Sequence, residues 1–215
     1  MSPRSAELNE HLREQSRERI LAAALQVFAE KGFHNATISE ITACAGVSRG
    51  LITYYFPGKQ QLAHELLGRY LDGVAALVGT GGDPDERLAK VIDGVLMSVH
   101  QSLPVQRLAL SLMTHPSTHP VFAQVEQEKD VELTGIEDSL RGLFAARGAE
   151  DPALEEVMLR SVLEGVIFKV TVYEDTYPLE RIRRRLYAMY DLASPAEPLV
   201  DADPPPVGRL RAPGA

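Results

Sequence analysis

Apolar residues recur at three- and four-residue spacing along most of the chain, and no alternation of apolar and polar residues lasts more than a few positions. The first spacing places side chains on one face of an α-helix, whereas a half-buried strand requires alternation. We therefore predict an all-α fold. The expected helices span roughly 16–30, a short stretch starting at Thr37, 48–56, 60–77, 84–102, 104–114, 118–146, 152–173 and 178–192.

The length of 215 residues fits a small helical module followed by a larger one. We expect a flexible N-terminal arm over 1–15, the small module over 16–62 and the larger domain over 63–193. From Ser194 onward the chain is rich in Pro, Ala and Asp and includes Pro204-Pro205-Pro206. This composition cannot support a packed element, so we predict a disordered tail over 194–215.

Local signals in the small module predict a helix-turn-helix. Gly32 supplies a stop for the first helix. Thr37 and Glu40 have the spacing of a capping box, which begins a second helix. Gly46 allows the chain to turn at positive φ, and Ser48 is a favourable N-cap for a third helix.

The third helix divides into two faces. Its inward face is apolar and aromatic and consists of Leu51, Ile52, Tyr55 and Phe56. Its outward face consists of Arg49, Gly50, Thr53 and Tyr54. Such a polar face, with a glycine where backbone and DNA must approach closely, suits the major groove. Lys59 begins the next helix, where it could hold a phosphate. The alternative is a helix-turn-helix bundle that binds no DNA.

The net charge of −8 argues against a nucleic-acid partner, but the acidity is unevenly distributed. Residues 1–62 carry 7 Lys and Arg against 6 Asp and Glu, whereas the rest of the chain carries 15 against 24. The small module is therefore free of the acidic excess. Ahead of the first helix, Arg and Glu alternate, so we expect a frayed terminus there rather than a minor-groove arm.

The run from Gly46 to Leu62 resembles the signature of the TetR family, and the similarity extends over about residues 16–62. The resemblance implies a DNA-binding domain followed by a helical domain that dimerises and senses a small molecule. It also implies DNA contacts, mostly to phosphates, by Thr37, Ser48, Arg49, Gly50, Tyr54, Tyr55 and Lys59. Thr53 stands where many members have an aromatic residue, and its methyl group could contact thymine.

The resemblance places the dimer seam on the helices over 152–173 and 178–192. A ligand pocket needs a few polar groups inside an apolar interior. The candidate ligand-binding residues are His100, Arg107, Met113, Phe122, Glu164, Phe168 and Thr171. We expect a repressor that binds a palindromic operator as a homodimer and is released by a small-molecule effector of unknown identity. The alternatives are control by a protein partner without any ligand and, more remotely, an enzyme or metabolite-binding module with a vestigial helix-turn-helix.

Other classes of function find little support in the sequence. No nucleophile, zinc-protease or paired-cysteine motif occurs, so we expect neither catalysis nor a cofactor. His115 and His119 flank a proline-containing connection without an obvious third ligand, so we expect no metal site. Cys44 is expected to be a packing residue. No apolar run is long enough to span a bilayer, and we expect a cytoplasmic protein.

Overall fold

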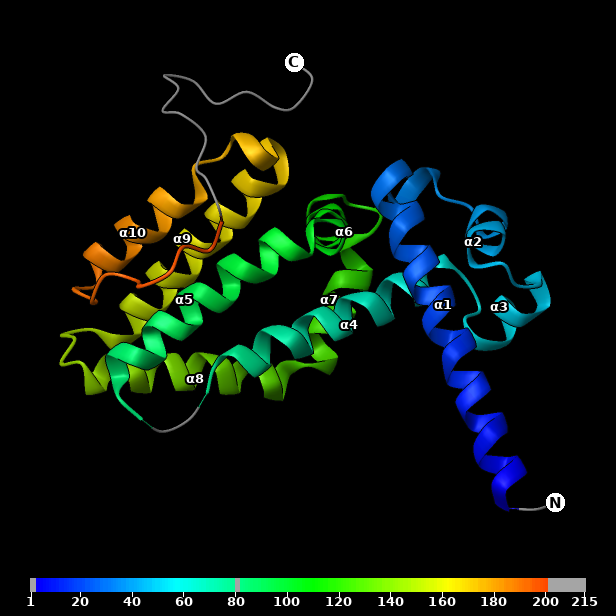
Figure 1. Ribbon diagram of the computed structural model, residues 1–215, viewed down its shortest axis with the longest axis horizontal. Coiled ribbons are helices and arrows are strands. Elements are labelled where there is room, and N and C mark those ends of the chain that lie inside the picture. The colour runs from blue at the N-terminus through cyan, green and yellow to red at the C-terminus, as the bar shows by residue number, and fades with distance from the viewer. Residues whose placement is uncertain (1–2, 80–81, 201–215) are drawn as a thin grey trace. The chain divides into compact units, whose positions relative to one another are not determined.

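The computed structural model describes residues 3–79 and 82–200, with side chains from residue 10 onward. Within these ranges the chain is helical and contains no strand, so the predicted all-α fold is confirmed (Figure 1). The helices are α1 (Pro3–Asn35), α2 (Ile38–Ala45), α3 (Arg49–Tyr55), α4 (Lys59–Leu77), α5 (Pro84–Gln101), α6 (Leu103–Thr114), α7 (His119–Glu128), α8 (Asp130–Ala146), α9 (Pro152–Tyr173) and α10 (Leu179–Met189), with a 3-10 turn, η1, at Glu174–Thr176.

The chain forms two compact units. The N-terminal unit holds the residues up to Tyr70 together with Arg107–Glu128, and the C-terminal unit holds Leu71–Gln106 together with the chain from Lys129 onward. This division differs from the expected boundary after Leu62, because the segment 107–128 joins the N-terminal unit. Its side chains contact that unit: the rings of His115 and His34 lie 4.2 Å apart, and Glu128 lies 2.9 Å from His64.

The first helix starts earlier than expected, at Pro3 instead of Ser16. Side chains spaced by three and four residues support the added turns: Arg13 lies 3.9 Å from Glu10, and Gln15 lies 2.9 Å from His11. The predicted stop at Gly32 is confirmed, since this residue has a non-helical backbone with φ 74°. Residues 33–35 therefore form a separate final turn.

Four helices, α5, α8, α9 and α10, build the core of the C-terminal unit (Figure 1). Pro at the start of α5 and of α9, each behind an aspartate N-cap, explains where these two helices begin. The expected single helix over 118–146 is wrong, because the chain breaks at Lys129 into α7 and α8. Lys129 has a non-helical backbone, and neither Gly nor Pro stands at this break. The Lys129 ammonium lies 2.5 Å from the Asp72 carboxylate, so a tertiary contact is made where the helix is interrupted.

Residues 194–200, which we expected within the disordered tail, lie against α10. The Leu199 amide donates to Glu180 Oε2 at 3.0 Å, and the Glu197 carbonyl accepts from Arg183 Nη1 at 2.6 Å. Leu199 and Val200 also pack on the core of the unit. Buried polar groups on α10 thus hold this stretch. The remainder of the predicted tail, 201–215, lies outside the described residues, as do residues 1–2 of the expected arm.

Candidate DNA-binding surface

The turns that set α2 and α3 follow the predicted local signals. The Glu40 amide donates to Thr37 Oγ1 at 3.2 Å, and the Thr37 amide donates to Glu40 Oε2 at 3.0 Å, which completes the capping box. Gly46 ends α2 in the left-handed region at φ 62°. Ser48 caps α3 by accepting from the Leu51 amide at 3.2 Å. These local bonds fix the angle between the two helices.

The Glu40 carboxylate also forms a salt bridge. It lies 2.5 Å from the Lys31 ammonium and accepts from the backbone and the hydroxyl of Thr37. The bond from Lys31, followed by those from Thr37, lowers the pKa of Glu40 to about 2. The carboxylate therefore stays ionised at any ordinary pH, and the start of α2 stays capped.

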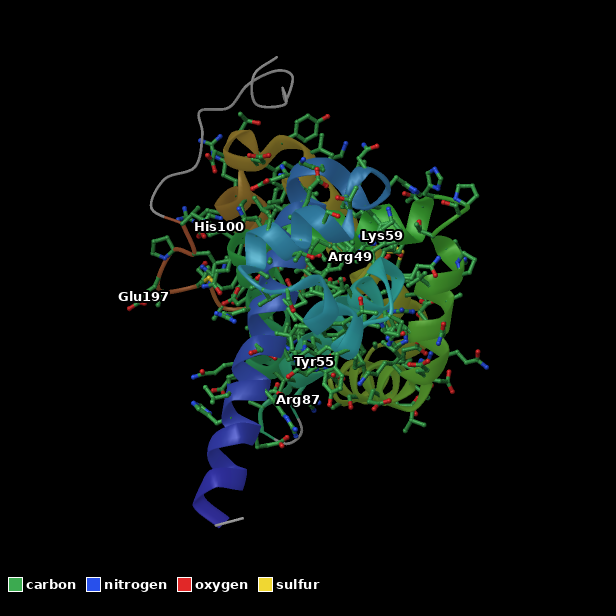
Figure 2. The ribbon with its side chains drawn as sticks, turned by 90° about the vertical axis from the view of Figure 1, so that its right-hand side faces the viewer. Arg49, Tyr55, Lys59, Arg87, His100 and Glu197 are labelled. Carbon is green, nitrogen blue, oxygen red and sulfur yellow. The ribbon has the colours of Figure 1, made fainter. Side chains whose placement is uncertain are left out.

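The two predicted faces of α3 are confirmed. Ile52 and Phe56 are buried, and Leu51 and Tyr55 are half-buried. The outward residues Arg49, Gly50, Thr53 and Tyr54 are all exposed, and Tyr54 reaches 71% exposure. The structure thus gathers these four predicted residues on one open surface, with Arg49 labelled in Figure 2.

The exposed side chains of α3 are available to a ligand. Among the residues that the structure describes, the Arg49 guanidinium has neither a hydrogen bond nor an ion pair. Thr53 Oγ1 donates to the Arg49 carbonyl at 3.1 Å, so the hydroxyl is used within the helix and the methyl group is left for contacts. The Tyr54 ring packs edge-on against the Tyr55 ring, with the ring centroids 5.1 Å apart.

Lys59 behaves differently from the other predicted DNA-binding residues. Its ammonium donates to the backbone carbonyls of Phe33, His34 and Ala36 at 2.9, 2.8 and 3.2 Å. It also lies 4.9 Å from the centre of the Phe33 ring. The residue is half-buried at the start of α4. Sequence reasoning missed these partners because they lie on α1 and in the turn after it, more than twenty positions away.

The candidate ligand-binding residues do not form one buried cluster within either unit. Arg107, Met113 and Phe122 belong to the N-terminal unit, whereas the others belong to the C-terminal unit. Five of the seven are exposed: His100, Arg107, Met113, Glu164 and Phe168. Thr171 is buried, but its hydroxyl donates to the Ile167 carbonyl at 2.8 Å. The sequence did not single out Gln106, which is only 1% exposed and whose Nε2 has no hydrogen-bond partner among the described residues.

Helix α9 presents a second surface that its own unit leaves open. Large apolar side chains recur on it at helical spacing and remain exposed: Leu154, Val157, Met158, Phe168 and Val172. Gly165 lies in the same helix, and an added Cβ there would meet no atom within 4 Å. Both features permit another surface to approach closely.

No group of three or more His, Cys, Asp or Glu residues is placed to hold a metal ion among the residues that the structure describes. Cys44, expected to be a packing residue, is exposed instead, with its sulfur 3.5 Å from Gln26 Oε1. None of the described helices is both long and apolar enough to cross a membrane.

Comparison with known proteins identifies the helix-turn-helix unit. Residues 20–66 match the model of the bacterial regulatory proteins of the tetR family. The helix-turn-helix domain of this protein belongs to the TetR family. The matched residues cover the second half of α1, all of α2 and α3 and the start of α4, so they include the exposed face of α3.

Similarity to known proteins extends beyond the helix-turn-helix domain. The HTH-type transcriptional regulator BetI of Ectopseudomonas mendocina is 25% identical over 183 residues, covering 82% of this chain and 92% of the relative. The repressor BepR of Brucella suis is 44% identical over 55 residues, 26% of each chain. The TetR-family regulator PfmR of Thermus thermophilus shares the fold, with a TM-score of 0.63 and 20% identity over 81% of this chain and 93% of that one. All three of these proteins are named as transcriptional regulators or repressors.

The variant Gly50→Ala distinguishes an effect on stability from an effect on DNA binding. An added Cβ would meet no atom within 4 Å, so we expect unchanged stability or a gain of about 0.5 kcal/mol from helix propensity. Where DNA lies close to the backbone, the methyl group should lower operator affinity by about ten- to a hundredfold. Thermal melting and gel-shift titration measure the two effects.

The matched control is Gly73→Ala on α4, which also has room for a Cβ and lies outside the helix-turn-helix. It should leave operator affinity unchanged. Equal affinities for Gly50→Ala and the wild type would show that DNA does not approach α3 at this residue.

Proposed function

We propose that this TetR-family protein is a cytoplasmic repressor that binds a palindromic operator as a homodimer and is released by a small-molecule effector. The observation that carries the DNA-binding part is the exposed face of α3, where Arg49 has no partner among the described residues. A guanidinium left unpaired on a recognition helix is suited to guanine edges or to phosphates. Thr53 is exposed and its hydroxyl is bonded within the helix, so its methyl group would be available to contact thymine.

Footprinting on the DNA that flanks the protein's own gene tests this proposal. The protein should protect one inverted repeat, and the logarithm of affinity should fall linearly with the logarithm of salt concentration. If Arg49 contacts a phosphate in each of two copies, Arg49→Ala should reduce the salt slope by about two. If it contacts bases, the variant should instead lose discrimination at one position of each half-site.

The control is Lys90→Ala, which removes an exposed cation from α5 in the C-terminal unit. It should leave both the affinity and the salt slope unchanged. An equal loss in both variants would indicate general charge attraction instead of recognition by α3. Absence of protection at low salt, on any flanking fragment and in a selection from random sequences, would contradict the proposal.

The exposed apolar side chains of α9, called here the apolar stripe, support the proposal of a homodimer. An apolar surface of this kind, left in water, favours association, and a two-fold axis buries the same stripe of both copies together. Helix α10 would complete the seam, with Arg184, Arg185 and Met189 exposed along it. Two copies would then present two α3 helices to successive major grooves of a palindrome.

The buried side chain of Gln106 is the observation that supports binding of a small-molecule effector. An amide N–H without a partner in a buried position costs about 1–3 kcal/mol, and a bound molecule with an acceptor oxygen would satisfy it. The effector shifts the dimer only as far as its affinities for the DNA-bound and released forms differ. Compounds that raise the melting temperature should therefore also abolish the footprint. Stabilising compounds that leave the footprint intact would argue for control by a protein partner.

A further inference from the structure

The turn between α1 and α2 exposes carbonyl groups that its own helix cannot satisfy. Gly32 interrupts α1 with φ 74°, and the chain leaves helical structure after Asn35. The last carbonyls of a helix have no intrahelical donor and carry the negative end of the helix dipole. A cation placed there both donates hydrogen bonds and offsets the dipole.

Lys59 occupies this position from a different helix. An ammonium group has three N–H donors, and those of Lys59 meet three carbonyl acceptors, on Phe33, His34 and Ala36, at 3.2 Å or less. The Phe33 ring beneath it, 4.9 Å away, adds a cation–π contact. A phosphate could take a hydrogen bond from Lys59 only by displacing one of these carbonyls.

The position of Lys59 in the sequence gives this contact a role in recognition. Phe56 caps the end of α3 and is buried, and Lys59 begins α4 directly after the Pro57-Gly58 turn. The contact therefore ties the end of the recognition helix to the end of α1. Arg17 on α1 supports the same junction, since its guanidinium lies 5.5 Å from the Phe56 ring.

We infer that Lys59 is a positioning residue, which fixes α3 against α1 by capping the α1–α2 turn, and that it is not a phosphate ligand. Its effect on operator affinity rests on the proposed DNA-binding function. The use of all three N–H donors of Lys59 in the free protein is independent of that function. Two measurements keep these parts separate.

The first measurement uses the wild-type protein without DNA. Reductive methylation with ¹³C-formaldehyde labels lysine amines, and the chain has only five lysines, whose signals single Lys→Arg variants assign. Reaction needs the amine lone pair, so Lys59 must first leave its acceptors. We expect Lys59 to react at least about tenfold more slowly than the exposed Lys90. Equal rates would overturn the inference.

The second measurement compares Lys59→Met with the matched control Lys90→Met on the operator, at a temperature where both are folded. If Lys59 positions α3, Lys59→Met should lower operator affinity at least about tenfold, leave the salt slope unchanged and lower the melting temperature. Lys59→Arg, which keeps several N–H donors, should restore part of the affinity. Lys90→Met should change none of these quantities.

Two results would overturn the inference. A salt slope reduced by about two in Lys59→Met, with stability unchanged, would make Lys59 a phosphate ligand in each copy. Unchanged affinity in a folded Lys59→Met protein would make the contact structural only. Failure of the wild-type protein to bind any DNA would instead defeat the proposed function, and slow methylation of Lys59 would still show that the turn is capped.

Discussion

Arg183→Ala is expected to lower the free energy of unfolding of the C-terminal unit by about 2–4 kcal/mol, because it leaves the half-buried Asp93 carboxylate without its cationic partner. Arg183 is 5% exposed, and its guanidinium donates to both oxygens of Asp93, at 2.7 and 2.6 Å. Tyr187 donates to the same carboxylate at 2.7 Å. Burial, followed by this bond to Asp93, raises the pKa of Tyr187 to about 12.

The substitution should also release residues 194–200 from α10, since Arg183 donates to the Glu197 carbonyl as well. Urea unfolding followed by circular dichroism measures the change in stability, and hydrogen exchange at the Leu199 amide reports the release of the segment. Lys90→Ala, which removes an exposed cation from α5 in the same unit, should alter stability by no more than about 0.5 kcal/mol. Similar stabilities for the two variants would show that the buried cluster does not hold α10 to α5.

Phe168→Glu is expected to convert the proposed dimer to a monomer. Phe168 is 48% exposed within the apolar stripe of α9, and a two-fold axis would bring two glutamates into the same seam. Burying two like charges there should weaken association by about a thousandfold or more. Sedimentation velocity measures the change. Operator affinity should fall with it, because the two recognition helices would then bind independently.

The matched control is Val131→Glu, which introduces the same charge at an apolar residue that is 82% exposed on α8 and lies outside the stripe. This variant should keep the oligomeric state of the wild type. A Phe168→Glu protein that still sediments as a dimer would place the seam elsewhere.

The helix-turn-helix was predictable from sequence because its signals are local. Thr37 and Glu40 cap each other over three positions, and Gly46 and Ser48 act on their own backbone. Thr42 within α2 donates its hydroxyl to the Ile38 carbonyl at 2.6 Å, a bond that threonine commonly makes inside a helix. Spacing alone therefore predicted which side chains of α3 face outward.

The features that sequence reasoning missed depend on distant residues. Lys59 was expected to hold a phosphate, and its three acceptors lie on α1 and in the turn that follows it. The break at Lys129 has no Gly or Pro, and residues 194–200 gain their order from Arg183 and Glu180. In each case a side chain finds its partner only after the helices have packed.

Recognition of a palindrome by paired α3 helices is tested most directly by a selection from random DNA sequences with the full-length protein, in parallel with Arg49→Ala. We expect the wild type to enrich an inverted repeat whose half-sites lie about one helical turn, or a multiple of it, apart. Arg49→Ala should lose enrichment at the same position of both half-sites. Enrichment of a single asymmetric site, or the same repeat at equal strength with both proteins, would contradict recognition of a palindrome by paired α3 helices.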